Sequence, residues 1–205
     1  MKKLLLTLIF LSSFAFSQFF LSVIDSASIG GKGAYNDLDQ INDTTYVYVY
    51  TDQSDLDGFF ITFNMNEDND NITVIEQYEF DTVNGFCPTV DVINDTTFIV
   101  IYTDASNTQQ AIIIDTDLNF DNANEIDQYQ IGSSIQKPMT ESVLIDNTHL
   151  LTTWTDNVND LWAKIITWDG SYNLSNVDSF EIDNVEGFFS EMDTLSSSLF
   201  AIGYG

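Results

Sequence analysis

Residues 41–46 read INDTTY, residues 93–98 read INDTTF, and residues 145–150 read the looser IDNTHL. The offset between copies is 52 residues both times (93 − 41 and 145 − 93). An aromatic residue, a threonine and an aspartate follow each copy in step, which makes Asp52, Asp104 and Asp156 equivalent. A period of this size indicates an array of supersecondary units that bury their apolar faces against one another.

Each repeat contains four stretches that are typical of β-strands. In the second copy the continuously apolar core of residues 97–103 suits a strand covered on both faces. Residues 125–131 alternate between apolar and polar side chains, as a strand with one wet face does. The Asn-Asp pairs at residues 42–43 and 94–95 favour tight hairpin turns, because Asn and Asp tolerate a positive φ. No helical period of adequate length occurs, so we predict an all-β fold.

The third strand of each repeat is aligned by the same 52-residue offset. This alignment places residues 58–63 beside residues 110–115 and residues 162–167.

Four antiparallel strands per roughly 50 residues resemble the blade of a β-propeller, in the size range of kelch and WD40 repeats. The likeness is closest to degenerate secreted propeller repeats of the type Asp-x-Thr-x-Phe-Val-Val-x-Tyr-x-Asp, carried here by residues 95–104. The chain has no Trp-Asp ending, no kelch Gly-Gly pair and no sialidase Asp box. The resemblance therefore implies a β-propeller-like array of four-stranded antiparallel blades, and no particular activity. A parallel β-helix is the alternative, but its coils are usually shorter and the hairpin turns argue against it.

The expected units are blades at residues 36–82, 88–132 and 138–183, a partial blade at 188–205, and an N-terminal outer strand at 20–30. This amounts to about three and a half blades, an incomplete ring, whereas closed propellers typically have about four to eight. The favoured explanation is a truncated form of a longer protein with roughly six to eight blades. A defective four-bladed ring and two chains that complete one another are the alternatives.

The first 17 residues have the pattern of a cleaved secretory signal. Lys2 and Lys3 precede an apolar stretch at residues 4–14, and Ala15-Phe16-Ser17 is a small-x-small cleavage site. The apolar stretch is far shorter than the ~20 residues of a membrane-spanning helix. No cysteine stands at the cleavage point for a lipid anchor. We expect a secreted, extracellular or cell-surface protein.

All 32 acidic residues lie beyond residue 17, together with three lysines and no arginine, so this part carries a formal charge of 3 − 32 = −29. Such a charge repels phosphate backbones and anionic lipids, which excludes nucleic acid and disfavours membranes as partners. The general explanation is solubility in a salty medium. Binding of divalent cations is the sharper alternative.

Cys87 is the single cysteine, so neither an internal disulfide nor a Cys-based zinc site can form, and its apolar neighbours predict burial. Calcium is the one cofactor that the sequence suggests. Oxygen-bearing side chains alternate at Asp115, Asp117, Asn119 and Asp121, like the start of a calcium loop. The sixth and twelfth positions hold Phe120 and Ile126 instead of Gly and Glu, which favours an ordinary solvated hairpin loop.

Asp52, Asp104 and Asp156 have two interpretations. They could form an acidic rim for cations or polyhydroxy ligands, or each could cap its own turn, which their recurrence favours. Aromatic ligand candidates in the expected loops are Trp162, Phe86 and Phe188. The aromatic residues within the second strands are expected to pack between blades: Tyr50, Tyr102, Trp154 and Tyr204.

No catalytic residue is predicted. His149 is the only histidine and stands at a strand position, so no nucleophile-histidine-acid set can be assembled. The leading hypothesis is a non-enzymatic propeller scaffold for binding or adhesion to a glycan or protein at its loop face. The alternative is a secreted glycoside hydrolase or lyase, which needs two acids about 5–10 Å apart. The sequence leaves the ligand and the oligomeric state open.

Overall fold

The computed structural model describes residues 26, 33–66, 71–133, 135–185, 187, 190–196 and 199–205, without the side chains of residues 136–140. Apart from Ser26, the expected signal segment and N-terminal strand lie outside these residues, as does Phe188. All regular structure in the described part of the chain is β-strand, which confirms the all-β prediction.

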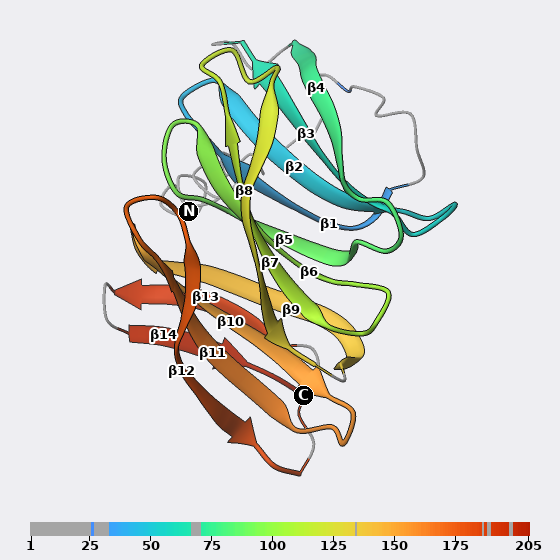
Figure 1. The fold of residues 1–205 in the computed structure, drawn as a ribbon, viewed down its shortest axis with the longest axis vertical. Helices are drawn as coiled ribbons and strands as arrows, with labels where there is room; N and C mark the ends of the chain where they lie inside the picture. Colours follow the sequence, from blue (N-terminus) through green and yellow to red (C-terminus); the bar gives the residue numbers. More distant parts are fainter. Residues whose placement is uncertain are drawn as a thin grey trace, which may run out of the picture.

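The described strands form three four-stranded sheets and one two-stranded sheet, each antiparallel and in chain order. The first sheet contains β1 (Gly33–Gln40), β2 (Thr45–Asp52), β3 (Gly58–Met65) and β4 (Ile72–Asp81). The second contains β5 (Phe86–Val92), β6 (Thr97–Thr103), β7 (Gln109–Thr116) and β8 (Ala123–Gly132). The third contains β9 (Ile135–Asp146), β10 (His149–Asp156), β11 (Leu161–Trp168) and β12 (Leu174–Asp183). β13 (Glu191–Ser196) and β14 (Leu199–Gly203) form the last, and the sheets follow one another along the long axis (Figure 1).

The hairpins between first and second strands are alike in successive repeats. Asn42 Oδ1 accepts hydrogen bonds from the amides two and three residues further on, at 3.1 and 3.0 Å. Asn94 Oδ1 does the same at 3.0 and 3.1 Å. Neither residue has a positive φ, so the prediction of a positive-φ turn is wrong. The side-chain amide turns the chain instead, by replacing the missing ladder partners of two backbone N–H groups.

The sequence alignment of the third strands is wrong by one residue in the first repeat. Phe60 pairs with Val49, whereas the residue paired at the equivalent place in the second sheet is Ala111, opposite Ile101. The loop between β2 and β3 joins partners seven positions apart (58 − 51), and the next copy joins partners six apart (109 − 103). One extra loop residue therefore shifts the strand, and such a shift exchanges its two faces.

The core lies between the sheets. Phe60 of the first sheet packs edge-on against Phe98 of the second, with ring centroids 5.1 Å apart. On its other face the second sheet buries Ile99 and Ile101 against Leu150 and Ile166 of the third. Because the second sheet is covered on both faces, every residue of β6 is buried, as the apolar run predicts.

Cys87 is buried, as predicted. Burial raises the pKa of its thiol to about 12, so the thiol stays protonated at neutral pH.

Candidate functional site

The recurring aspartates cap their turns. Asp104 Oδ1 accepts hydrogen bonds from the amides of Ser106 at 2.8 Å and Thr108 at 2.9 Å. Asp52 Oδ1 accepts one from the amide two residues on at 2.8 Å, and Asp156 Oδ1 accepts two, at 2.9 and 3.0 Å. These contacts match the turn-capping interpretation. Asp156 alone carries a further bond that involves an aromatic side chain.

The residues of the candidate calcium loop are engaged with their own hairpin. Asp115 Oδ1 accepts the hydroxyls of Thr96 and Thr97 at 3.0 and 2.9 Å. Asp117 Oδ1 accepts the amides of Asn119 and Asp121 at 3.0 and 3.3 Å. Across the described ranges, no three His, Cys, Asp or Glu side chains gather as a metal site.

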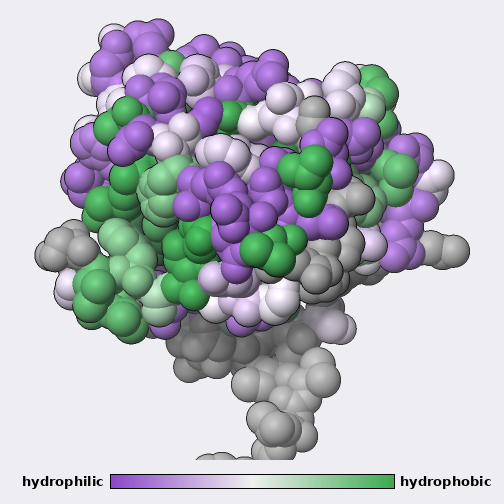
Figure 2. Space-filling view, turned by 90° about the horizontal axis from the view of Figure 1, so that it is seen from below, coloured by the Kyte–Doolittle hydropathy of each residue, from purple (hydrophilic) through white to green (hydrophobic). Residues whose placement is uncertain are grey.

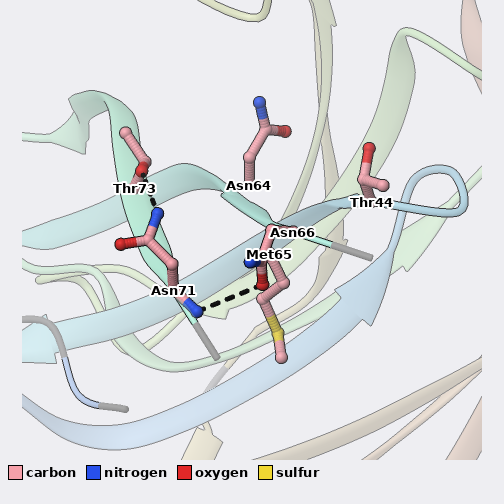
Figure 3. A pocket seen from close by; sticks show the side chains of 6 residues that line it. All are labelled: Thr44, Asn64, Met65, Asn66, Asn71 and Thr73. Atoms are coloured by element: carbon pink, nitrogen blue, oxygen red, sulfur yellow. Dashed lines mark hydrogen bonds between the residues drawn. The ribbon is translucent and has the colours of Figure 1, made fainter. Parts of the chain in front are cut away.

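The counterpart of this loop in the first sheet encloses a hollow of about 440 Å³ (Figure 3). Asn71 Nδ2 donates to Thr73 Oγ1 at 3.2 Å, and the Asn71 amide donates to Asn66 Oδ1 at 3.2 Å. Asn64 Oδ1 accepts the Thr45 hydroxyl at 2.8 Å. These polar groups bond one another, and the lining contains neither a charge nor an aromatic ring, so this hollow offers a ligand few anchors.

A second hollow, of about 250 Å³, lies where the end of β8 meets the third sheet. We call it the tryptophan hollow; it is lined by Gly132, Ser133, Trp154, Asp156, Trp162, Lys164 and Ser179. The rings of Trp154 and Trp162 stack with centroids 6.3 Å apart and an interplanar angle of 13°. Trp162 Nε1 donates to Asp156 Oδ2 at 3.0 Å, which fixes the orientation of both side chains. Two of the residues singled out from the sequence are thus brought together.

The hollow exists because the third sheet departs from the repeat. In the first two sheets a glutamine amide donates to the tyrosine hydroxyl of the second strand, at 2.7 Å from Gln77 to Tyr50 and 3.0 Å from Gln128 to Tyr102. Strand register puts Ser179 at the glutamine position of the third sheet, and Trp154 stands at the tyrosine position. The serine is too short to reach across, so space remains above the indole.

Two further departures line the same space. Lys164 takes the place of Ile61 and Ile112, and Trp162 takes the place of Phe59 and Gln110. The Lys164 ammonium lies 5.8 Å from the centroid of the Trp154 ring and donates to the carbonyl oxygen of Ile131. Desolvation lowers the pKa of this lysine.

Gly132 forms the wall opposite the indole of Trp154. A Cβ at this position would lie 2.9 Å from Trp154 Cε2, which is too close for two carbon atoms. Glycine is therefore required for β8 to approach the ring.

Phe86 lies apart from this hollow in the chain order, at the start of β5. Its ring packs against Tyr35 of β1, with centroids 4.6 Å apart.

A set of carboxylates on the first strands was not singled out from the sequence. Asp37 Oδ2 and Asp39 Oδ2 on β1 accept the amides of Val90 and Val92 on β5, at 2.9 and 2.7 Å. Asp91 Oδ1 on β5 accepts the amide of Leu144 on β9 at 3.2 Å. Donor and acceptor are 53 residues apart in all three bonds, so one contact is repeated between successive sheets.

Burial perturbs these acids. Desolvation raises the pKa of Asp91 to about 6, although the Ser142 hydroxyl bonds its Oδ2 at 2.6 Å. Desolvation, followed by the charges of Asp37, Glu191 and Asp91, raises the pKa of Glu141 on β9 to about 7. Alternating acids in a strand look like a solvated face in the sequence. Only the packing of β1 on β5 and of β5 on β9 sets them against backbone amides.

Comparison with known proteins gives one likeness of fold. The chain is similar to a solved structure of Hsv2 from Kluyveromyces lactis, with a TM-score of 0.45 and 12% identity. The match covers 66% of this chain and 44% of the Hsv2 chain. No family model and no curated protein matches the sequence. In the part of the chain that the structure describes, no helix has the length and apolar character to cross a membrane.

Proposed function

We propose that this protein is a secreted or cell-surface binding module of β-propeller architecture. The signal-like N-terminus motivates the location. Face-to-face packing of successive four-stranded sheets, with β1, β5 and β9 side by side, supports the architecture.

The ligand that we propose is a neutral sugar, bound at the tryptophan hollow. The observation that carries this proposal is the joint departure of the third sheet from the repeat, at Trp154, Trp162, Lys164 and Ser179. A purely structural position would be free to keep the repeat residue, whereas a binding site is needed once.

The chemistry of the hollow suits a hydroxyl-rich ring. Indole faces bury the C–H face of a sugar, and few but well-placed polar groups fix its orientation. Asp156 is already oriented by its turn and by the Trp162 indole, so its carboxylate accepts hydroxyls at little entropic cost. The Lys164 ammonium and the Ser179 hydroxyl supply donors on the other side.

Intrinsic fluorescence tests this proposal directly, because two of the three tryptophans line the hollow. We expect a panel of neutral disaccharides of glucose and galactose to include one that shifts the emission on titration. Trp162→Ala should weaken its binding by about tenfold or more, as loss of a stacking anchor does. The matched control is Gln110→Ala, since Gln110 holds the same position in the second sheet and also bonds its turn aspartate, Asp104, at 2.8 Å.

Two results would contradict the sugar site. One is the absence of any emission shift up to millimolar sugar, measured also by calorimetry. The other is equal weakening by Trp162→Ala and Gln110→Ala, because the effect would then come from the fold and not from the hollow.

A glycoside hydrolase or lyase is the second candidate function, and Glu141 favours it. A carboxyl group whose pKa is raised to about 7, near Asp37 and Asp91, suits a general acid at neutral pH. We expect Glu141→Gln to abolish any hydrolysis of aryl glycosides, followed by release of the coloured phenol. Hydrolysis that survives in this variant, or sugar binding with no turnover in the unaltered protein, would remove this candidate.

A further inference from the structure

The last sheet has an open edge. In each four-stranded sheet the second strand pairs on both sides, whereas β14 pairs only with β13 among the described residues. Its other edge therefore presents backbone N–H and C=O groups that can pair with an added strand. β13 packs against β9, so β14 lies further out, and Tyr204 just after it hydrogen-bonds Asp183 at the end of β12.

β14 is also the one uncharged edge strand in the described sheets. Its residues are Leu199 to Gly203, with no acid or lysine. Each of the other edge strands carries at least one acidic residue: β1, β4, β5, β8, β9, β12 and β13. Charged edges oppose the addition of a strand, and β14 lacks this protection.

An uncovered apolar surface lies beside this edge. Tyr78 of β4 and Tyr129 of β8 are partly buried against the core that the next sheet provides. Phe180 holds the equivalent position on β12 and is 44% exposed, and Val177 is 51% exposed. The last sheet has only two described strands, so its outer half does not cover them. Figure 2 looks at this end of the molecule and shows apolar groups among hydrophilic ones.

The surroundings select the charge of a partner. A hollow of about 510 Å³ at the end of β12 is lined by residues 181–185, which include Glu181 and Asp183. Asp178 is on the same strand, and the whole chain has a formal charge of −27. A second copy of this chain would bring further acids to this place, whereas lysine or arginine side chains would be attracted to it.

We propose that β14 binds an extended segment of a basic partner protein, in which apolar residues alternate with lysine or arginine. The segment adds as a third strand beside β14, so its backbone supplies the missing ladder bonds. Its apolar side chains lie over Val177 and Phe180, and its cations face Glu181 and Asp183. This surface is separate from the tryptophan hollow and does not depend on the sugar proposal.

Synthetic peptides test the proposal on the full chain. The probe is a fluorescein-labelled peptide of about nine residues that alternates valine and lysine, long enough for one strand. We expect it to bind with a Kd in the range of about 10–100 μM at low salt, a range typical of one exposed strand site. The same peptide with N-methyl groups on alternate residues should bind about tenfold more weakly, because it keeps the charge but cannot form the ladder.

Variants locate the site. Phe180→Ser should weaken binding of the valine–lysine peptide by about fivefold, as loss of one apolar contact does. Leu118→Ser is the control, since Leu118 is 82% exposed on another loop. Equal binding of the methylated peptide, equal effects of the two variants, or no binding would each overturn the proposal. So would sedimentation showing a dimer that Phe180→Ser dissociates, because a second copy would then occupy the edge.

Discussion

Replacing Gly85 with alanine is expected to lower the free energy of unfolding by about 3 kcal/mol, because the new Cβ has no room. It would lie 2.3 Å from Gly58 Cα and 2.7 Å from Gly58 N, and backbone atoms cannot swing aside as a side-chain end can. The link between the first two sheets passes through this point. The Gly85 amide donates to Leu56 O, and its carbonyl accepts the buried Thr51 hydroxyl, both at 2.9 Å. Strain at Gly85 therefore also disturbs the bonds that join the sheets.

Thermal unfolding measures the effect, and we expect a fall in Tm of about 10 °C for a chain of this size. Gly170→Ala is the control, since a Cβ there meets nothing within 4 Å. Gly187→Ala should lie between the two, because its Cβ would press on Leu161 Cβ at 2.5 Å, which belongs to a side chain. Equal Tm values for the Gly85 and Gly170 variants would show that the close approach of the two glycines does not stabilise the fold.

The same link shows how far the sequence predicts this fold. The repeat predicts the strands well: the apolar stretch at 97–103 is β6, and the hairpins after β1 and β5 have like caps. The missed feature is one extra loop residue before β3, which no local preference reveals. Pairing alone shows that Gly58 is equivalent to Gln109, so the Gly58–Gly85 approach belongs to the first sheet only.

The candidate site was predicted in part. Asp156 and Trp162 were singled out separately, and Trp154 was expected to pack between sheets, as its exposure of 6% agrees. Lys164 and Ser179 were missed, although both stand where the preceding repeat has Ile112 and Gln128. A lysine in place of a buried isoleucine was the available signal. The search favoured positions that recur, whereas a single binding site is marked by positions that do not.

Acidification from pH 8 to pH 5 is expected to raise the stability of this protein, in contrast to the usual acid destabilisation. Burial raises the folded-state pKa of Asp91 to about 6 and of Glu141 to about 7, and it also raises the pKa of Asp37. The folded state therefore binds more protons than the unfolded chain between about pH 4 and pH 7, where free carboxyls titrate near 4. Stability must fall as the pH rises through this window, because the unfolded state then binds fewer protons. Below pH 4 the trend reverses at Asp146, whose pKa the bond with His149 lowers to about 2.

Asp91→Asn separates this local effect from the general relief of a −27 charge. The amide oxygen still accepts the Leu144 amide, and the amide nitrogen donates to Ser142 Oγ, so both contacts of the carboxyl survive. We expect the variant to be more stable at pH 8 by about 1–2 kcal/mol, with a Tm about 4 °C higher and a flatter pH profile. Asp95→Asn removes the same charge from an exposed turn and should keep the slope of the unaltered protein. Parallel profiles for the two variants would mean that the long-range charge, and not the acid between β5 and β9, sets the pH dependence. A flattened profile for Asp91→Asn alone would show that the carboxylates that join the sheets are held there at a cost that protonation removes.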